Sequence, residues 1–140
     1  MPEIKRLKKI TEQNLAEINA LLKQLSPNFL PKGSQALKKA LANGVVYIAC
    51  DGKKIIGLAS IFFRDTLMKK MGTIEDIIVD ENHRGKGIGK KLMLALIKEA
   101  KKKKATCLDL TSRPERKTAN LMYKALGFEK RKTNYYRLIF

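Results

Sequence analysis

The stretch from Thr73 to Leu92, TIEDIIVDENHRGKGIGKKL, constrains the fold more than any other part of the chain. Its apolar run Ile77–Val79 is short, β-branched and bounded by polar residues, which is typical of a strand covered on both faces. Residues 80–83 end this strand, and three glycines alternate with other residues at positions 85–89. The sequence therefore predicts a strand, a glycine loop and a helix start in direct succession.

The glycine loop is suited to bind a phosphate-bearing ligand. Gly85, Gly87 and Gly89 have no Cβ, so backbone amides can approach a ligand, and the following helix directs its positive dipole end to the same place. The spacing disfavours a GxGxxG dinucleotide loop, which needs intervals of two and three residues, because both intervals here are two. The nucleotide triphosphatase loop GxxxxGK[ST] is absent too, since Lys91 stands where Ser or Thr is required.

Two motifs together resemble those of a known enzyme family. Residues 84–89, RGKGIG, match the [Q/R]xxGx[G/A] pyrophosphate loop of the GNAT superfamily of acyl-CoA-dependent N-acyltransferases. Residues 119–128, ANLMYKALGF, resemble the second signature of that family, AxxLYxxxGF, with Met122 in place of Leu. Two motifs in the family's order are much more specific than one, and the resemblance implies a coenzyme A-dependent N-acetyltransferase.

The hydrophobic pattern and the resemblance predict the same fold. We expect a single α/β domain over residues 1–140, with a mixed central sheet of six to seven strands, about four helices and the order βααβββαβαββ, because 140 residues with 44% hydrophobic content can bury one core. The expected strands cover residues 4–9, 45–50, 55–63, 74–79, 106–111, 128–133 and 135–140. The expected helices cover residues 12–25, 34–43, 87–103 and 118–126.

The pattern also predicts how these elements are connected. The three strands between residues 45 and 79 should be antiparallel, with a hairpin at Asp51-Gly52 and a turn at residues 69–72. The strand at 106–111 should lie parallel to the loop-bearing strand, because a helix connects the two. The last two strands should form a closing hairpin around Thr133-Asn134. Ligands in such sheets bind beyond the carboxyl ends of the strands.

Composition limits the cellular context and the partners. No apolar run approaches the ~20 residues of a membrane span, and the amino terminus has no apolar signal segment, so we expect a cytoplasmic protein that has no membrane partner. Cys50 and Cys107 lie in apolar strand candidates and no CxxC occurs, which favours two buried thiols. With a single His, we expect no metal site.

The net charge of +17 attracts phosphates, nucleic acid or acidic proteins, but does not select among them. The basic run Lys101–Lys104 falls at the end of an expected helix, where cations are favoured by the dipole, so a solvated helix terminus explains it. No RNP, zinc-finger or leucine-zipper pattern appears, and specific nucleic-acid recognition is therefore not expected. The charge favours only weak, sequence-independent binding to RNA.

The resemblance implies a set of coenzyme contacts in this chain. In that family the loop amides hold the pyrophosphate of acetyl-CoA, and the pantetheine lies beside the central strand like an additional strand. The residues that would cradle the pyrophosphate are Arg84, Gly85, Lys86, Gly87, Ile88, Gly89 and Lys90. Backbone groups of Ile78 and Val79 would hold the pantetheine and the thioester carbonyl, and Asn120 would bond the coenzyme. For Lys86 and Lys90, an ordinary surface position is as good an interpretation as a phosphate contact.

Direct attack by an amine requires a base for the amine and an acid for the departing thiolate. The resemblance makes Tyr123 the acid, because it falls on the tyrosine of AxxLYxxxGF. Glu75, Asp76 and Asp109 are base candidates on two neighbouring strands, with Glu75 ahead of Asp109, and a water chain is an alternative. Glu75 and Asp76 are adjacent on a strand, so they should not both face one pocket.

One departure from the family pattern concerns Arg116, which stands where many relatives have Asn. Arg116 and Arg113 could contact a phosphate or an acidic acceptor instead, or be solvated loop arginines. The acceptor amine, on a small molecule or a protein, has no recognisable motif, and the positive charge disfavours a polycationic one.

Two further interpretations of the same residues remain open. The first is a non-catalytic acyl-CoA-binding sensor, or a basic RNA- or ribosome-associated module, on the same fold. The second is compatible with either function: the composition of Tyr135–Phe140 favours an edge strand that pairs with another copy, which would give a homodimer.

Overall fold

The computed structural model describes residues 2–140, which form five strands, four α-helices and one short 3₁₀ helix. In chain order the elements are β1 (Glu3–Arg6), α1 (Glu12–Leu25), α2 (Ser34–Asn43), β2 (Gly44–Asp51), β3 (Lys54–Asp65), β4 (Lys70–Val79), η1 (Glu81–His83), α3 (Ile88–Lys102), β5 (Cys107–Asp109) and α4 (Lys117–Ala125). The chain divides into two compact units, the first ending at Leu110 and the second running from Thr111 to Phe140.

The sheet of the first unit has the strand order β1-β2-β3-β4-β5. Strands β1 to β4 pair antiparallel and β5 pairs parallel to β4, which confirms the mixed sheet and the predicted directions. The turn predicted at residues 69–72 is wrong, because Lys70 already belongs to β4. The chain turns earlier, where the amide of Thr66 donates to the Lys69 carbonyl at 2.9 Å and the Thr66 hydroxyl accepts from the Lys69 amide at 3.1 Å.

The first two helices begin where the sequence predicted. Thr11 caps α1 in a capping box, because its hydroxyl accepts from the Asn14 amide and the Asn14 side chain accepts from the Thr11 amide. Residues 34–43 form α2, and Gly44 follows it directly as the first residue of β2. The capped start fixes the position along the chain from which α1 presents its apolar face to the sheet.

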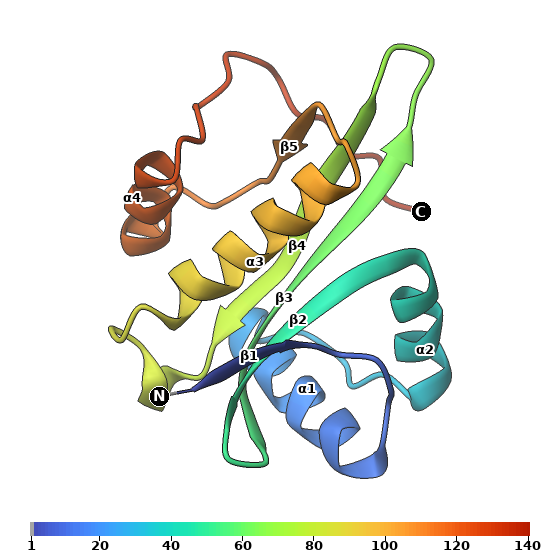
Figure 1. The fold of residues 1–140 in the computed structure, drawn as a ribbon, viewed down its shortest axis with the longest axis vertical. Coiled ribbons are helices and arrows are strands. Elements are labelled where there is room, and N and C mark those ends of the chain that lie inside the picture. The colour runs from blue at the N-terminus through green and yellow to red at the C-terminus, as the bar shows by residue number, and fades with distance from the viewer. Residues whose placement is uncertain (1) are drawn as a thin grey trace. The chain divides into compact units, whose positions relative to one another are not determined.

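The sheet of the first unit is covered on both faces. Figure 1 shows α3 on one side of β2–β4, with α1 and α2 on the other. On the α1 side, Ile18 and Leu21 belong to one buried cluster with side chains from β2, β3 and β4, among them Leu58 and Ile78. On the α3 side, Leu92 is fully buried, and its Cδ1 lies 3.3 Å from the position that a Cβ on Gly57 would occupy.

The predicted closing hairpin is wrong in this chain. The second unit contains α4, whereas residues 128–140 have no regular secondary structure, so the described sheet has five strands rather than six to seven. Residues 129–140 are exposed throughout. A strand is stable only where a neighbour completes its backbone hydrogen bonds and covers its apolar side chains. Strand-forming composition alone therefore does not produce a strand here.

Gly72 allows β5 to join the sheet, and an added methyl group there should weaken the fold. A Cβ on Gly72 would lie 2.7 Å from Cδ2 of Leu108, nearer than real contacts allow, and 3.0 Å from Cδ1 of Ile61, which is tighter than most real contacts. We expect Gly72→Ala to lower the free energy of unfolding by about 1–3 kcal/mol, the usual cost of overpacking. Urea unfolding measures this, and an unchanged midpoint would contradict the assigned packing of β5 on β4.

Candidate functional site

The glycine loop between β4 and α3 depends on two left-handed backbone positions. Gly85 and Gly87 have φ angles of 78° and 77°, which side-chain-bearing residues rarely adopt. A Cβ at either position would meet no atom within 4 Å. The loop therefore needs glycine for its conformation, and the space beside both glycines is open to an incoming ligand.

Helix α3 begins with amides that lack a carbonyl acceptor inside the helix. Its N-cap is Gly87, which has no side chain to cap them, and the first helical bond runs from the Lys91 amide to the Gly87 carbonyl at 3.1 Å. The amides of residues 88–90 precede that bond, and the positive end of the helix dipole lies at the same place. The side chain of Ile88 is buried, so this residue can offer a ligand only its backbone. This helix start is suited to bind an anion.

Strand β4 has an open backbone edge beyond its short pairing with β5. The parallel register covers only Met71–Thr73 of β4 against β5. In the described part of the first unit, no strand pairs with residues 74–79 on that side, whereas β3 pairs with them on the other. An extended ligand can therefore lie along this edge in place of a strand.

A β-bulge at Asp76 decides which residues of β4 face the open edge. Ser60 of β3 pairs with Glu75 and Leu58 pairs with Ile78, so two residues of β4, Asp76 and Ile77, lie opposite one residue of β3. Asp76 has a φ of 48°, the left-handed conformation that accommodates the extra residue. The bulge also shows that the strictly alternating strand assumed for Glu75 and Asp76 is wrong at this point.

The hydrogen-bonding direction of β4 changes across the bulge. The Asp80 amide donates to the Ile56 carbonyl at 2.7 Å, so Asp80 and Ile56 are a hydrogen-bonded pair. In an antiparallel ladder every second pair is hydrogen-bonded, so the backbone groups of Ile78 also point towards β3, to Leu58. The same alternation turns the backbone groups of Ile77 and Val79 to the open edge. Of the predicted pair Ile78 and Val79, the register thus favours Val79 as a ligand contact, and it adds Ile77.

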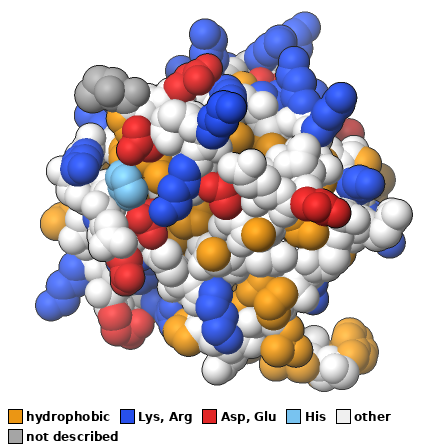
Figure 2. Space-filling model, turned by 90° about the horizontal axis from the view of Figure 1, so that it is seen from below, with side chains coloured by type: hydrophobic (Ala, Val, Ile, Leu, Met, Phe, Trp, Pro, Cys, Tyr) orange, Lys and Arg blue, Asp and Glu red, His pale blue; other side chains and the backbone are white. Residues whose placement is uncertain are grey.

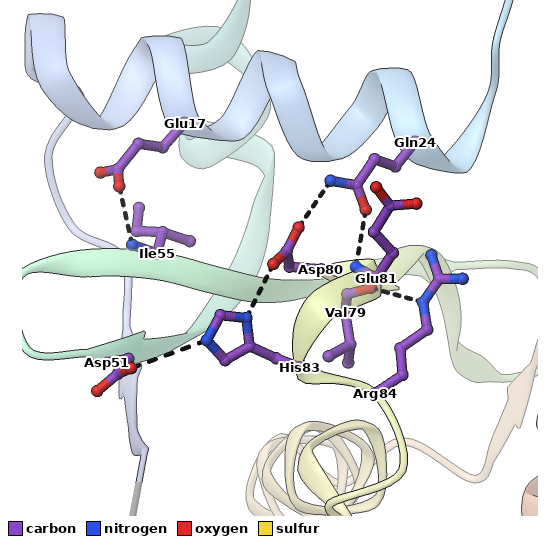
Figure 3. Close-up of polar contacts among 9 residues, drawn as sticks. All are labelled: Glu17, Gln24, Asp51, Ile55, Val79, Asp80, Glu81, His83 and Arg84. Carbon is purple, nitrogen blue, oxygen red and sulfur yellow. Dashed lines mark hydrogen bonds and ion pairs between the residues drawn. The ribbon is translucent and has the colours of Figure 1, made fainter.

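Arg84 is held against this edge by its own strand. Its Nε donates to the Val79 carbonyl at 2.9 Å, as Figure 3 shows. The bond occupies the carbonyl of Val79 but leaves its amide, and it leaves the two terminal nitrogens of the guanidinium available to a phosphate. The first residue of the glycine motif is therefore oriented before any ligand arrives.

A polar network fixes the turn that leads into the loop. The Gln24 side chain of α1 donates from Nε2 to Asp80 Oδ1 at 2.8 Å, and its Oε1 accepts from the Glu81 amide at 3.0 Å. His83 Nδ1 lies 2.8 Å from Asp80 Oδ2, and its Nε2 lies 3.8 Å from Asp51 Oδ2 (Figure 3). The hydrogen bonds from Gln24 and His83 lower the pKa of the Asp80 carboxyl group.

Sequence reasoning did not identify this network. Residues 80–83 were expected only to end the strand, and Gln24 lies 56 residues before Asp80 in the chain. The sequence did carry one signal, because the single His of the chain stands between the apolar strand and the glycine loop. The contact of Gln24 on α1 with Asp80 could be found only once the helix was placed on the sheet.

Glu75 and Asp109 project from the same face of the sheet. Leu58 of β3 packs on the α1 side of the sheet, and Ser60, two residues later, faces the same side. Glu75 is paired with Ser60 and therefore projects from that side as well. Asp109 pairs with Thr73 of β4, two residues before Glu75, and has the same orientation by register. Both residues are exposed. The structure thus brings the two predicted base candidates to neighbouring strands on one face.

Asp76 differs from these two acids through its position in the bulge. The residue as a whole is exposed, but local burial of its carboxyl group raises its pKa. A carboxylate with a raised pKa accepts a proton more readily at neutral pH. Asp76 therefore stays among the base candidates beside Glu75 and Asp109.

The second unit carries the predicted acid, Tyr123, on α4. Its side chain is buried, and its ring meets that of Phe128 edge to face, with centroids 6.1 Å apart. Burial raises the pKa of the Tyr123 hydroxyl group, and the charge and hydrogen bond of the Arg116 guanidinium act in the opposite direction. Since a guanidinium only donates hydrogen bonds, the Tyr123 oxygen is the acceptor in this contact.

Asn120 lies on the same helix, one turn before Tyr123. Its Nδ2 donates to the Arg113 carbonyl at 3.1 Å, which ties α4 to the preceding turn. This bond occupies part of the side chain and leaves its Oδ1 available. The predicted coenzyme contact of Asn120 stays a prediction.

The described residues show neither a metal site nor a membrane span. Within residues 2–140, no three side chains of His, Cys, Asp or Glu gather in a group that could hold a metal ion. None of the helices in that range combines the length and the apolar character needed to cross a bilayer.

Comparisons with known proteins show the family and the fold of this chain. A family model described as "Acetyltransferase (GNAT) family" matches residues 15–128. No curated protein matches the sequence. Among solved structures, a transcriptional regulator from Bacillus halodurans C-125 has a TM-score of 0.85 at 24% identity, with 100% of both chains covered.

Two solved acetyltransferases have similar folds. An aminoglycoside acetyltransferase from an uncultured soil metagenomic sample, in complex with trehalose, has a TM-score of 0.84 at 23% identity, covering 99% of this chain and 96% of the other. Glucosamine-6-phosphate N-acetyltransferase from Arabidopsis thaliana has a TM-score of 0.80 at 19% identity, covering 99% and 98%. At these identities the structural matches establish the fold.

Replacing Asp80 should weaken the fold in a pH-dependent way. The lowered pKa of Asp80 means that its ionised form stabilises the native state above the ordinary carboxyl pKa, and that this stability is lost as the pH falls through the lowered value. We expect Asp80→Asn to lose about 1.5–3 kcal/mol at neutral pH, the usual contribution of hydrogen bonds to a charged group.

Urea unfolding of both proteins from neutral to acid pH measures this difference. The difference in unfolding free energy between them should narrow as the pH falls from the ordinary carboxyl pKa through the lowered pKa of Asp80. A gap of constant size across the whole range would show that the ionised carboxyl group does not contribute through its hydrogen bonds.

Proposed function

Because this chain belongs to the GNAT acetyltransferase family, we propose that it is an acetyl-CoA-dependent N-acetyltransferase acting on a primary amine. The observation that carries the proposal is the series of available backbone amides in two places, at the open edge of β4 and at the start of α3. Such a series fits a ligand that has an extended amide-containing arm and a pyrophosphate. Coenzyme A has both.

The residues present fit the coenzyme in two places. The pyrophosphate lies against the loop from Arg84 to Lys90, where the left-handed glycines leave open space and the helix start offers unpaired amides. The pantetheine arm lies along residues 74–79 of β4 and bonds the backbone groups of Ile77 and the amide of Val79. Lys86 and Lys90 are exposed and add positive charge near the phosphates.

The reaction is a direct transfer in a ternary complex. The amine nitrogen attacks the thioester carbonyl carbon, the carbon–sulfur bond breaks, and the proton lost by the amine passes to a base. Tyr123 gives its proton to the departing thiolate. Two features support this role: burial keeps the phenol protonated at neutral pH, and accepting from Arg116 leaves its own O–H free to donate.

The base is one of the carboxyl groups on the sheet, or a water molecule that they hold. Glu75 and Asp109 share the α1 side of the sheet, and Asp76 has the raised pKa. Glu75 remains our first candidate, because it lies beside the point where β4 and β5 separate. An amine entering from the α1 side would reach it there.

The acceptor is a small-molecule or protein amine. Two of the similar structures are described as an aminoglycoside acetyltransferase and a glucosamine-6-phosphate N-acetyltransferase. Lys and Arg side chains are spread over the face in Figure 2, with Asp and Glu among them, rather than gathered in one basic patch. The net charge of +17 favours a neutral or anionic acceptor over a polycationic one.

A methyl group in the glycine loop should weaken coenzyme binding. Gly87→Ala forces a side chain into the left-handed conformation, at a cost of about 1–2 kcal/mol, and places that methyl group beside the phosphates. We expect the Kd for coenzyme A, measured by calorimetry, to rise about tenfold or more.

The matched control for this variant is Gly52→Ala. Gly52 has a φ of 61° and open space around it, but lies in the β2–β3 turn. The Gly52→Ala variant should therefore carry the same backbone strain as Gly87→Ala, but its Kd for coenzyme A should equal that of the native chain. If the Gly87→Ala variant and the native chain bind coenzyme A with equal affinity, the glycine loop does not belong to the coenzyme site.

Thiol release from acetyl-CoA, measured against a panel of amines and amine-ended peptides, tests the activity. We expect acceptor-dependent release, with Tyr123→Phe lowering kcat by roughly 10²-fold, within the range of general-acid contributions, and leaving coenzyme affinity unchanged. Tyr135→Phe, a control at an exposed tyrosine, should behave like the native chain.

The outcomes separate the proposed enzyme from its alternative. Tight coenzyme binding without turnover on any amine would contradict the enzyme and favour a non-catalytic acyl-CoA sensor. Turnover that is unaffected by Tyr123→Phe would support the proposed acetyltransferase activity and show that Tyr123 is not its general acid.

A further inference from the structure

The turn between β3 and β4 exposes two apolar side chains at its tip. Leu67 is 108% exposed and Met68 is 90% exposed, although short turns are usually built from Gly, Pro, Asn, Asp or Ser. Figure 1 shows this turn at the top, projecting past the carboxyl-terminal end of α3. The first unit therefore presents the two side chains outward as a protrusion.

Hydrogen bonds around Thr66 fix the shape of the turn. The Thr66 hydroxyl accepts from the Met68 amide at 3.2 Å and donates to the Lys69 carbonyl at 3.0 Å. The Thr66 amide donates to the same carbonyl at 2.9 Å. A turn held in this way loses little conformational entropy when its tip binds a surface.

Positive side chains gather at the base of the turn. The members of this basic cluster are Arg64, Lys69, Lys70 and Lys101–Lys104. All of them are exposed except Lys70, which is half-buried. Residues 64–70 and 101–104 together hold seven cations and one acid, Asp65. The field beside the apolar tip is therefore strongly positive.

Two long-range contacts bring the end of α3 to the turn. The ammonium groups of Lys70 and Lys103 lie 6.0 Å and 5.9 Å from the centroid of the Phe63 ring, so both lysines meet at one residue of β3. The Thr106 amide donates to the Lys70 carbonyl at 2.9 Å, which fixes the chain after α3 beside the start of β4. The basic run at residues 101–104, which local sequence explains as a solvated helix terminus, thus lies close to the exposed tip.

An apolar tip above a basic cluster is complementary to the surface of an anionic bilayer. Apolar side chains enter the boundary of the acyl chains, while Lys and Arg stay at the level of the anionic headgroups. Single-stranded RNA is bound on exposed aromatic rings, whereas this tip is aliphatic and the Phe63 ring is half-buried beside two lysines. A stable protein interface needs far more surface than two side chains of one turn.

We propose that the β3–β4 turn docks on a bilayer that contains anionic lipids, with Leu67 and Met68 inserted and the basic cluster against the headgroups. The expectation of no membrane partner considered only spanning and signal segments, and docking needs neither. The turn precedes β4 and the glycine loop follows it, so the two lie at opposite ends of this strand. Docking therefore leaves the proposed coenzyme site accessible.

Co-sedimentation with phosphatidylcholine vesicles, with and without phosphatidylserine, tests the proposal. We expect binding only to the vesicles that contain phosphatidylserine, and weaker binding as salt is added. Leu67→Ser should lower the partition coefficient about tenfold, because the burial of one Leu side chain contributes on this scale. The matched control is Leu30→Ser, at a position that is 75% exposed, and it should bind like the native chain.

A second pair of variants tests the basic cluster. Lys101→Gln combined with Lys102→Gln should weaken vesicle binding about tenfold or more. The same substitutions at Lys38 and Lys39, both exposed on α2, remove equal charge and should weaken it much less. All of these variants should keep the thermal unfolding of the native chain, because the replaced side chains are exposed.

A reporter at the tip measures insertion directly. The chain contains no Trp, so Met68→Trp places a single indole there. Its emission should shift to shorter wavelength with phosphatidylserine vesicles and stay unchanged with phosphatidylcholine alone. Failure to bind anionic vesicles, or binding without this shift, overturns the proposal.

The two matched pairs can overturn the proposal as well. They do so if Leu67→Ser and Leu30→Ser weaken binding equally, or if the two lysine pairs do. Binding that depends on the lysines but not on Leu67, and that poly(U) RNA abolishes by competition, overturns it in favour of a charge-driven RNA surface.

Discussion

The bulge at Asp76 is the constraint on which the site depends. On its amino-terminal side, β4 follows the register that pairs Glu75 with Ser60, and on its carboxyl-terminal side it follows the register that pairs Ile78 with Leu58. The extra residue turns backbone groups of Ile77 and Val79 outward, beyond the point where β5 stops pairing. Without the bulge, the ladder would direct the amide of Ile78 to the open edge instead.

The edge, the loop and the helix start act as one preorganised surface. Arg84 closes the turn by bonding the Val79 carbonyl, and Gln24 and His83 hold the Asp80 carboxylate that precedes it. These contacts fix the path of the chain before the two left-handed glycines and the uncapped start of α3. Donors held rigidly in this way would reduce the entropy cost of binding the pyrophosphate in the proposed site, because no loop has to be ordered first.

Much of this arrangement could be predicted from the sequence, for local reasons. The glycine spacing, the β-branched run before it and the capping box of α1 are short-range signals, and the structure has the loop, β4 and α1 where these signals predicted them. The bulge could not be predicted in this way, because Asp76 resembles any polar strand residue until the pairing with β3 is known. The contact of Gln24 with Asp80 also depends on how α1 packs.

The prediction of a carboxyl-terminal hairpin was wrong for the opposite reason, because here the local signal was present and the partner strand was not. Residues 128–140 carry a strong local strand signal, yet a strand also requires a neighbour, and the second unit provides none for them. Local pattern therefore described which residues favour extended structure, but not whether a partner edge exists in the same chain.

Amide hydrogen exchange at β4, with and without coenzyme A, tests the central claim most directly. The account predicts that the amides of Ile77 and Val79 exchange fast in the free protein and slow strongly when coenzyme A is added, together with those of residues 88–90. The amide of Ile78 should be protected in both states by its bond to β3. If coenzyme A leaves Ile77 and Val79 unprotected, or if Ile78 is the amide that responds, the assigned register and the site built on it are wrong.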